Sequence, residues 1–192
     1  MILPVVAYGS PILRKVCDDI TSAYPELDRL IADMWETLYN SNGVGLAAPQ
    51  VNKPIRLFIV DTLQVVKDFN DEDKKKYPNE IPIKQVFINA RKIEETGKLW
   101  PYNEGCLSIP KVREDIQRTS NVHLSYMDEN FVEHTGTFHG ITARVIQHEY
   151  DHIEGKLFID YLSQLKKRLI KKKLDDVSNG KVKTDYRMLF PK

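Results

Sequence analysis

Two histidines and a glutamate lie within five residues of each other, in the sequence HEYDH at 148–152. Residues four apart on an α-helix lie one turn apart on the same face, so His148 and His152 can point their imidazoles at one metal ion. Glu149 lies beside them and is free to act as a general acid and base. Asp151 points elsewhere and is a reasonable hydrogen-bond partner for a ligand imidazole. The spacing predicts a metal-binding helix, although HExxH also occurs on solvated helices that bind nothing.

The third ligand is not where peptidases of the metzincin type place it. Those enzymes continue the motif to a further histidine, and this chain has Phe158 at that position. Glu154 is too close along the chain to reach the same ion, and the lysines at 171–173 offer no carboxylate. The segment downstream of the helix therefore supplies no third ligand.

Upstream of the helix, the segment NEGCLSIP presents Cys106 between Gly105 and Leu107 in a short extended stretch. Taken by itself, Cys106 fits buried packing better than metal ligation. With His148 and His152 it completes a set of one thiolate and two imidazoles, which leaves a fourth position open for water, as a hydrolytic site requires. We therefore predict that these three residues bind one divalent metal ion.

A glycine-rich segment, GVGLAAPQ, spans residues 43–50. Gly43 and Gly45 flank Val44 just after a predicted helix, so the backbone can adopt unusual angles and another chain can approach closely. A tight turn that enters a strand is the alternative interpretation. The amide of Gln50 could donate a hydrogen bond to a developing oxyanion.

Hydrophobic periodicity predicts three helices around these motifs. The first helix, within 25–43, places five apolar residues on one face: Leu27, Leu30, Ile31, Met34 and Leu38. The second, at 141–155, ends at Gly155 and has four inward residues: Ile141, Val145, Ile146 and His152. The third, at 163–177, turns its lysines outward and is predicted to turn four apolar residues inward: Leu165, Leu169, Ile170 and Leu174.

Stretches rich in β-branched and aromatic residues predict strands at 55–61 and 84–93 and a hairpin formed by 121–127 and 131–138. The segment 62–83 between the first two strands has a charged run and two prolines, so it predicts a surface insertion. We expect an α+β fold in which antiparallel β-sheets pack around the central HExxH helix, with an N-terminal helix and a C-terminal amphipathic helix.

Composition favours a single domain over residues 1–192. An apolar content of 42% suits one buried core, and no apolar stretch approaches the roughly 20 residues of a membrane span. The start of the chain does not resemble a secretion signal, and two cysteines make no disulfide framework, so a cytoplasmic location is expected. Residues 163–192 hold ten Lys or Arg against three Asp, which makes a basic C-terminal helix and tail.

Three motifs, in this order, closely resemble those of the peptide deformylases: GVGLAAPQ at 43–50, EGCLS at 104–108 and QHEYDH at 147–152. The resemblance covers nearly the whole chain except 62–83. It implies that Glu149 moves a proton and that Gln50 and the backbone N–H of Leu107 hold an oxyanion. It also implies that Gly45 and Leu46 hold a substrate peptide in the manner of an added strand. The residues expected to contact substrate are Gly43, Val44, Gly45, Leu46, Tyr102, Ile141 and Val145.

The implied reaction removes the formyl group from the formylmethionine of newly synthesised polypeptides and releases formate. Of the substrate-contacting residues, four are expected to line the apolar pocket for the methionine side chain: Val44, Tyr102, Ile141 and Val145. The resemblance implies Fe(II) as the native metal, with Zn, Ni or Co able to occupy the site, whereas ligand softness alone would favour zinc. It also implies that Arg113 or Arg118 pairs with Glu104.

Other interpretations of the sequence stay open. A metal endopeptidase would need a ligand downstream of His152, and a ribosome- or RNA-binding module with a structural metal would normally need four protein ligands. The basic helix is either a solvated face or a contact to ribosomal RNA near the peptide exit, and phosphate contacts of that kind weaken steeply with salt.

Overall fold

The computed structural model describes residues 1–77 and 80–191. Pro78 and Asn79 of the predicted insertion, and Lys192 at the end of the predicted tail, lie outside the described residues. A five-stranded antiparallel sheet has the order β2-β3-β4-β5-β6, and a second sheet pairs β1 with β7. The strands are β1 (Val5–Val6), β2 (Gly45–Ala47), β3 (Leu57–Asp61), β4 (Lys84–Cys106), β5 (Ile109–Met127), β6 (Glu133–His139) and β7 (Met188–Leu189).

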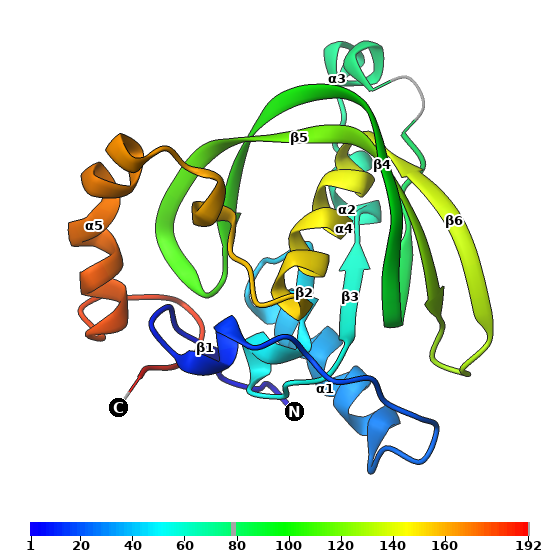
Figure 1. The fold of residues 1–192 in the computed structure, drawn as a ribbon, viewed down its shortest axis with the longest axis horizontal. Helices are drawn as coiled ribbons and strands as arrows, with labels where there is room; N and C mark the ends of the chain where they lie inside the picture. The colour runs from blue at the N-terminus through cyan, green and yellow to red at the C-terminus, as the bar shows by residue number, and fades with distance from the viewer. Residues whose placement is uncertain (78–79, 192) are drawn as a thin grey trace.

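The long strands β4 and β5 curve over one helix, so that the large sheet wraps around it (Figure 1). This helix is α4, which carries the HExxH motif. The α-helices are α1 (Leu27–Asn40), α2 (Leu63–Val66), α3 (Asp71–Lys76), α4 (Gly140–Ile153) and α5 (Gln164–Ser178). The predicted α+β architecture around a central HExxH helix is therefore confirmed. The small sheet differs from the prediction, because β1 and β7 run parallel.

Helix α4 is almost entirely buried, although many of its buried side chains are polar or charged, and the structure supplies partners for several of them. The residue that precedes the helix, His139, provides no side-chain cap. Instead, the carboxylate of Glu80 accepts hydrogen bonds from the backbone N–H groups of Ile141 and Thr142, at 2.7 and 2.8 Å. The helix is followed by Gly155, which has a positive φ of 68° and whose Cβ, if present, would lie 2.6 Å from a carbonyl oxygen. The start and the end of the motif helix are thus both fixed.

Helix α1 buries the five apolar residues predicted for its inner face, and these pack against β2 and β3. Strand β4 is longer than the predicted strand 84–93. Residues 91–99 are exposed, the following residues alternate between exposed and partly buried, and the strand ends at Cys106, two residues after the buried Glu104. The predicted hairpin is present as β5 and β6. In the segment 62–83, the short helices α2 and α3 bury no residue.

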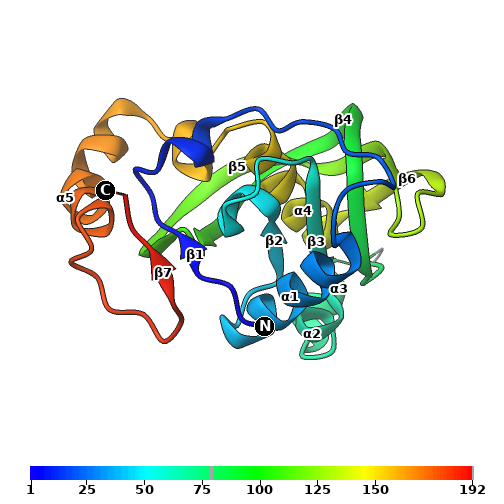
Figure 2. The ribbon, with the colours of Figure 1, turned by 90° about the horizontal axis from the view of Figure 1, so that it is seen from below.

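Helix α5 contacts the rest of the protein along a narrower stripe than its sequence predicts. Ile170, Leu174 and Val177 are buried, at spacings of four and three residues. Leu165 and Leu169 are 68% and 73% exposed, so the prediction that they face inward is wrong. Only one face of α5 packs against β5, and the side chains of these two leucines are not on that face. After α5 the chain returns to place β7 beside β1, so that two segments near the opposite ends of the sequence lie side by side (Figure 2).

Candidate active site

Three potential metal ligands meet where the end of β4 faces α4. Each of Cys106, His148 and His152 offers one donor atom, and these three atoms lie within 4.8 Å of one another. Sγ of Cys106 is 3.3 Å from Nε2 of His152. Among residues 1–77 and 80–191, no other His, Cys, Asp or Glu joins this group. One thiolate and two imidazoles make a donor set that suits a transition-metal ion and leaves a coordination position for a further molecule. The set therefore fits a divalent metal ion.

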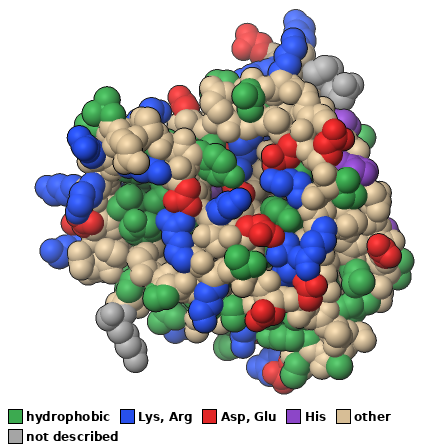
Figure 3. Space-filling view, in the orientation of Figure 1, with side chains coloured by type: hydrophobic (Ala, Val, Ile, Leu, Met, Phe, Trp, Pro, Cys, Tyr) green, Lys and Arg blue, Asp and Glu red, His purple; other side chains and the backbone are tan. Residues whose placement is uncertain are grey.

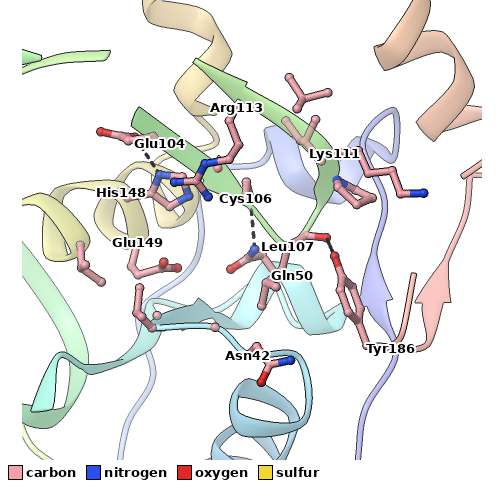
Figure 4. Close-up of a pocket in the computed structure, with 18 of the residues that line it drawn as sticks. Asn42, Gln50, Glu104, Cys106, Leu107, Lys111, Arg113, His148, Glu149 and Tyr186 are labelled. Atoms are coloured by element: carbon pink, nitrogen blue, oxygen red, sulfur yellow. Dashed lines mark hydrogen bonds and ion pairs between the residues drawn. The ribbon is translucent and has the colours of Figure 1, made fainter. Parts of the chain in front are cut away.

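The side chain of Glu104 orients one of these imidazoles. Its carboxylate lies 3.0 Å from Nδ1 of His148, so Nδ1–H donates and Nε2 is left to act as ligand (Figure 4). The same carboxylate accepts from Arg118 at 2.8 and 3.1 Å and from Arg144 at 2.9 Å. Burial alone would raise the pKa of Glu104, but His148 and Arg118 outweigh burial and lower it. Glu104 is thus a buried, ionised partner of the ligand.

The pairing of Glu104 with an arginine is confirmed for Arg118 and wrong for Arg113, which bonds to Asn103. The prediction that Asp151 holds a ligand imidazole is also wrong. Asp151 accepts from Arg118 at 2.6 Å and from the hydroxyl of Tyr161 at 3.0 Å. It therefore supports the site indirectly, by fixing the arginine that contacts Glu104.

The groups around His148 and His152 stabilise one positive charge at the predicted metal site. Burial alone lowers the pKa of His148, but the neighbouring Cys106 and Glu104 outweigh burial and raise it well above its usual value. Burial and the nearby His148 lower the pKa of His152, which keeps that ring neutral. A cation between the sulfur and the rings would take the place of the single proton that these surroundings stabilise.

Glu149 is on α4, directly after the potential ligand His148 in the sequence. It is buried, and burial raises its pKa to about 7. Its Oε2 atom is buried and has no hydrogen-bond partner among the described residues, so it is an acceptor whose partner is still to be supplied. Strand β2 approaches this carboxylate closely. A Cβ at Gly45 would lie 2.5 Å from Oε1 of Glu149, which explains why glycine is required there.

Gln50 presents its amide N–H₂ group to the same site. Its Oε1 accepts the backbone N–H of Ala47 at 2.8 Å, which turns Nε2 toward the hairpin that joins β4 and β5. Nε2 lies 3.3 Å from Oγ of Ser108 and 3.5 Å from Sγ of Cys106 (Figure 4). Leu107 follows Cys106 in this hairpin turn. The structure thus brings together the two donors that the sequence suggested for an oxyanion, although they lie 57 residues apart.

One open cavity of about 510 Å³ is lined by Gln50, Glu104, Cys106, Leu107, His148 and Glu149, and the third potential ligand, His152, is buried behind its wall. The cavity wall includes six of the seven residues predicted to contact substrate: Gly43, Val44, Gly45, Tyr102, Ile141 and Val145. Leu46 does not line it, because its side chain is fully buried in the core, so only its backbone could reach a substrate. Its strand, β2, is an edge strand whose neighbour in the sheet is β3.

The cavity wall also contains residues that the sequence did not single out as substrate contacts. Val65 comes from the segment 62–83, and Lys111 and Arg113 come from the start of β5. Residues 183–186 come from the segment after α5. No local motif distinguishes these positions in the sequence. They reach the cavity only through the long-range packing of the chain.

An α+β fold with three potential metal ligands beside a buried carboxylate is typical of a metal-dependent hydrolase. Comparison with known proteins gives a narrower answer. The polypeptide deformylase family model matches residues 2–168, so the chain belongs to the polypeptide deformylase family. The resemblance predicted from three motifs is therefore confirmed.

Individual relatives agree with this assignment. The chain is 54% identical to a peptide deformylase of Christiangramia forsetii, over 100% of this chain and 97% of that protein. A crystal structure of a peptide deformylase from Legionella pneumophila is similar with a TM-score of 0.78 and 31% identity, over 94% of this chain and 98% of that one. A peptide deformylase from Plasmodium falciparum is similar with a TM-score of 0.78 and 33% identity, over 92% and 95% of the two chains.

Proposed function

We propose that this protein hydrolyses the N-terminal formyl group of formylmethionine on newly synthesised polypeptides and releases formate. One observation carries the proposal. The donor atoms of Cys106, His148 and His152 lie within 4.8 Å of one another, and Glu149 lines the same cavity as Cys106 and His148, with a carboxylate oxygen that has no partner among the described residues. This arrangement suits hydrolysis of an amide that enters the cavity from outside.

Cys106, His148 and His152 would hold the metal ion. A divalent ion at that position would supply a Lewis acid that lowers the pKa of the attacking water. We propose Fe(II) as the native ion, on the resemblance to the family, and Zn, Ni and Co share the preference for imidazole and thiolate ligands. Metal analysis of protein purified without oxygen tests the identity of the ion.

Glu149 would accept a proton from the attacking water through its free oxygen. It would then return that proton to the amide nitrogen as the bond between this nitrogen and the formyl carbon breaks. Its raised pKa, about 7, suits a group that must both accept and release a proton near neutral pH. The products are formate and a free amino terminus.

Gln50 and Leu107 would stabilise the oxyanion that develops on the formyl carbonyl. The Nε2 group of Gln50 is directed toward the site by the bond between its Oε1 and Ala47. The backbone N–H of Leu107 belongs to the hairpin turn that also presents Cys106. Two fixed donors stabilise the transition state more than the planar amide, because negative charge develops only during the reaction.

The substrate would lie along β2 with its methionine side chain in the apolar part of the cavity. The edge of β2 can add an extended peptide through the backbone of Gly45 and Leu46. Val44, Ile141 and Val145 provide the apolar wall, with Tyr102 beside them. We infer that the oxyanion donors fit the small formyl group closely and exclude larger acyl groups.

A direct assay separates this proposal from the endopeptidase alternative. The metal-loaded protein should release formate from a formyl-Met peptide. It should not cleave the same peptide when the N-terminus carries an acetyl group, or when the N-terminus is unmodified. Cleavage of internal peptide bonds, or no formate release with any of the four metals, would contradict the proposal.

The contact with ribosomal RNA stays a prediction. Figure 3 shows Lys and Arg side chains over α5, and the exposed members include Arg168, Lys172 and Lys173. Changing these three to Glu should weaken binding to ribosomes and flatten its dependence on salt. Unchanged affinity would leave α5 as a solvated face. In the part of the chain that the structure describes, no helix is both long and apolar enough to cross a membrane, and the expected cytoplasmic location also stays a prediction.

A further inference from the structure

A tyrosine near the C-terminus reaches into the hairpin turn that carries Cys106 and Leu107. The hydroxyl of Tyr186 donates a hydrogen bond to the backbone carbonyl of Leu107 at 2.8 Å, across 79 positions in the chain (Figure 4). Burial and the nearby Cys106 raise the pKa of Tyr186, which therefore keeps its proton and remains a donor. Tyr186 also lines the cavity.

The backbone around Tyr186 is fixed by the small sheet. Arg187 and Leu189 accept hydrogen bonds from the backbone N–H groups of Val5 and Ala7, at 2.9 and 2.8 Å. On the other side, the hydroxyl of Thr184 donates to the carbonyl of Tyr186 at 2.7 Å. The backbone on both sides of Tyr186 is therefore held by hydrogen bonds. This places the phenol ring next to Leu107.

The same turn is also held by the other end of the chain. The backbone N–H of Tyr8 donates to the carbonyl of Ser108 at 2.8 Å. Two consecutive carbonyls of the turn, those of Leu107 and Ser108, are thus fixed by residues from the two opposite ends of the sequence. The side chain of Leu107 lies close to Gly43, where an added Cβ would come within 3.0 Å of it. These contacts leave the Leu107 residue little freedom to rotate.

We propose that Tyr186 is a positioning residue for the reaction, which acts by holding Leu107 so that its backbone N–H points at the oxyanion. This inference rests on the proposed function, because it assigns Tyr186 a role in that same site. The family model ends at residue 168, and Tyr186 lies in the segment beyond its match. The segment after α5 therefore contributes to catalysis through a single side-chain hydrogen bond to the turn.

The variant Tyr186→Phe tests the proposal with little disturbance, because it keeps the ring and removes only the hydroxyl. Loss of a whole oxyanion donor costs about 10²- to 10³-fold in kcat, and a loosened donor should cost part of that. We expect kcat for the formyl-Met peptide to fall roughly 3- to 30-fold while KM changes by less than about twofold. The oxyanion contact is stronger in the transition state than in the bound substrate, which is why kcat carries the effect.

Tyr39→Phe provides the matched control. Its hydroxyl donates to Asp61 at 2.7 Å, and Tyr39 does not line the cavity. This variant loses a similar hydrogen bond, so it should lose similar stability while its kcat stays at the wild-type value. If kcat of Tyr186→Phe matches that of Tyr39→Phe, the positioning role is contradicted.

A measurement without turnover keeps the inference separate from the proposed function. The backbone amide resonances of Leu107 and Ser108 should shift in Tyr186→Phe and remain in place in Tyr39→Phe. Unchanged resonances would overturn the inference even if the wild-type protein is fully active. Absence of formate release by the wild-type protein would instead overturn the proposed function, and the amide resonances would still decide whether Tyr186 orders the turn.

Discussion

Oε2 of Glu104 lies 3.0 Å from Nδ1 of His148, and the same carboxylate lies between the guanidinium groups of Arg118 and Arg144. One buried anion thus orients a potential metal ligand and neutralises buried positive charge. The arrangement links the stability of the fold to the geometry of the site, because loss of the carboxylate affects both. It also explains why EGCLS contains a glutamate two residues before the cysteine.

Replacing Glu104 by Ala should destabilise the protein strongly. Arg118 and Arg144 are both buried; Arg144 would lose its carboxylate partner and Arg118 would keep only Asp151, and breaking a buried pair in this way costs about 3–5 kcal/mol. Glu114→Ala is the control, because its bridge to Lys166 is partly exposed and contributes less than about 1 kcal/mol. Denaturant unfolding of both variants measures the difference. Equal losses would show that the Glu104 network does not stabilise the fold.

Replacing Gly45 by Ala should lower turnover while the metal remains bound. The added Cβ would lie 2.5 Å from Oε1 of Glu149, so either the carboxylate or β2 must move. A displacement of about 1 Å near the reacting atoms can cost 10²-fold in rate. Gly136→Ala in β6 is the control, since its added Cβ meets nothing nearer than 3.5 Å. Assays of formate release should show the loss for Gly45→Ala alone, and a fully active Gly45→Ala protein would contradict this account of β2.

Replacing Glu80 by Ala should lower stability by about 1 kcal/mol, the usual value of a helix cap. The carboxylate accepts two hydrogen bonds from the first turn of α4, which has no side-chain cap of its own at His139. Thermal unfolding should show a lower Tm for this variant than for Glu129→Ala, where an exposed glutamate is removed. An unchanged Tm in Glu80→Ala would mean that the insertion does not support the motif helix.

The metal constellation could be predicted because its parts obey local rules. His148 and His152 follow helical spacing, and Cys106 is the one cysteine outside the N-terminal region. The five buried positions of α1 could be predicted for the same reason, since their periodicity is regular. The second half of β4 could not be predicted, because much of it is exposed and its sequence contains Gly97 and Pro101, which are unfavourable in strands.

Contacts between distant segments left no pattern in the sequence. Glu80 lies 61 positions before Ile141, whose N–H it accepts, and Tyr186 lies 79 positions after the carbonyl that it holds. Asp151 and Glu104 are both carboxylates near the site, and only the packed structure shows which of them reaches an imidazole. The spacing of Leu165 and Leu169 fits an apolar helical face, but a different face of α5 packs against β5.

The central claim is that Cys106, His148 and His152 bind one metal ion while Glu149 moves the proton without binding it. Metal content and formate release, measured together on Glu149→Ala and Cys106→Ala, test this claim most directly. Glu149→Ala should keep the metal and lose at least ~10²-fold in turnover, and Cys106→Ala should lose the metal. Full metal occupancy in Cys106→Ala, or turnover near the wild-type rate in Glu149→Ala, would contradict the account.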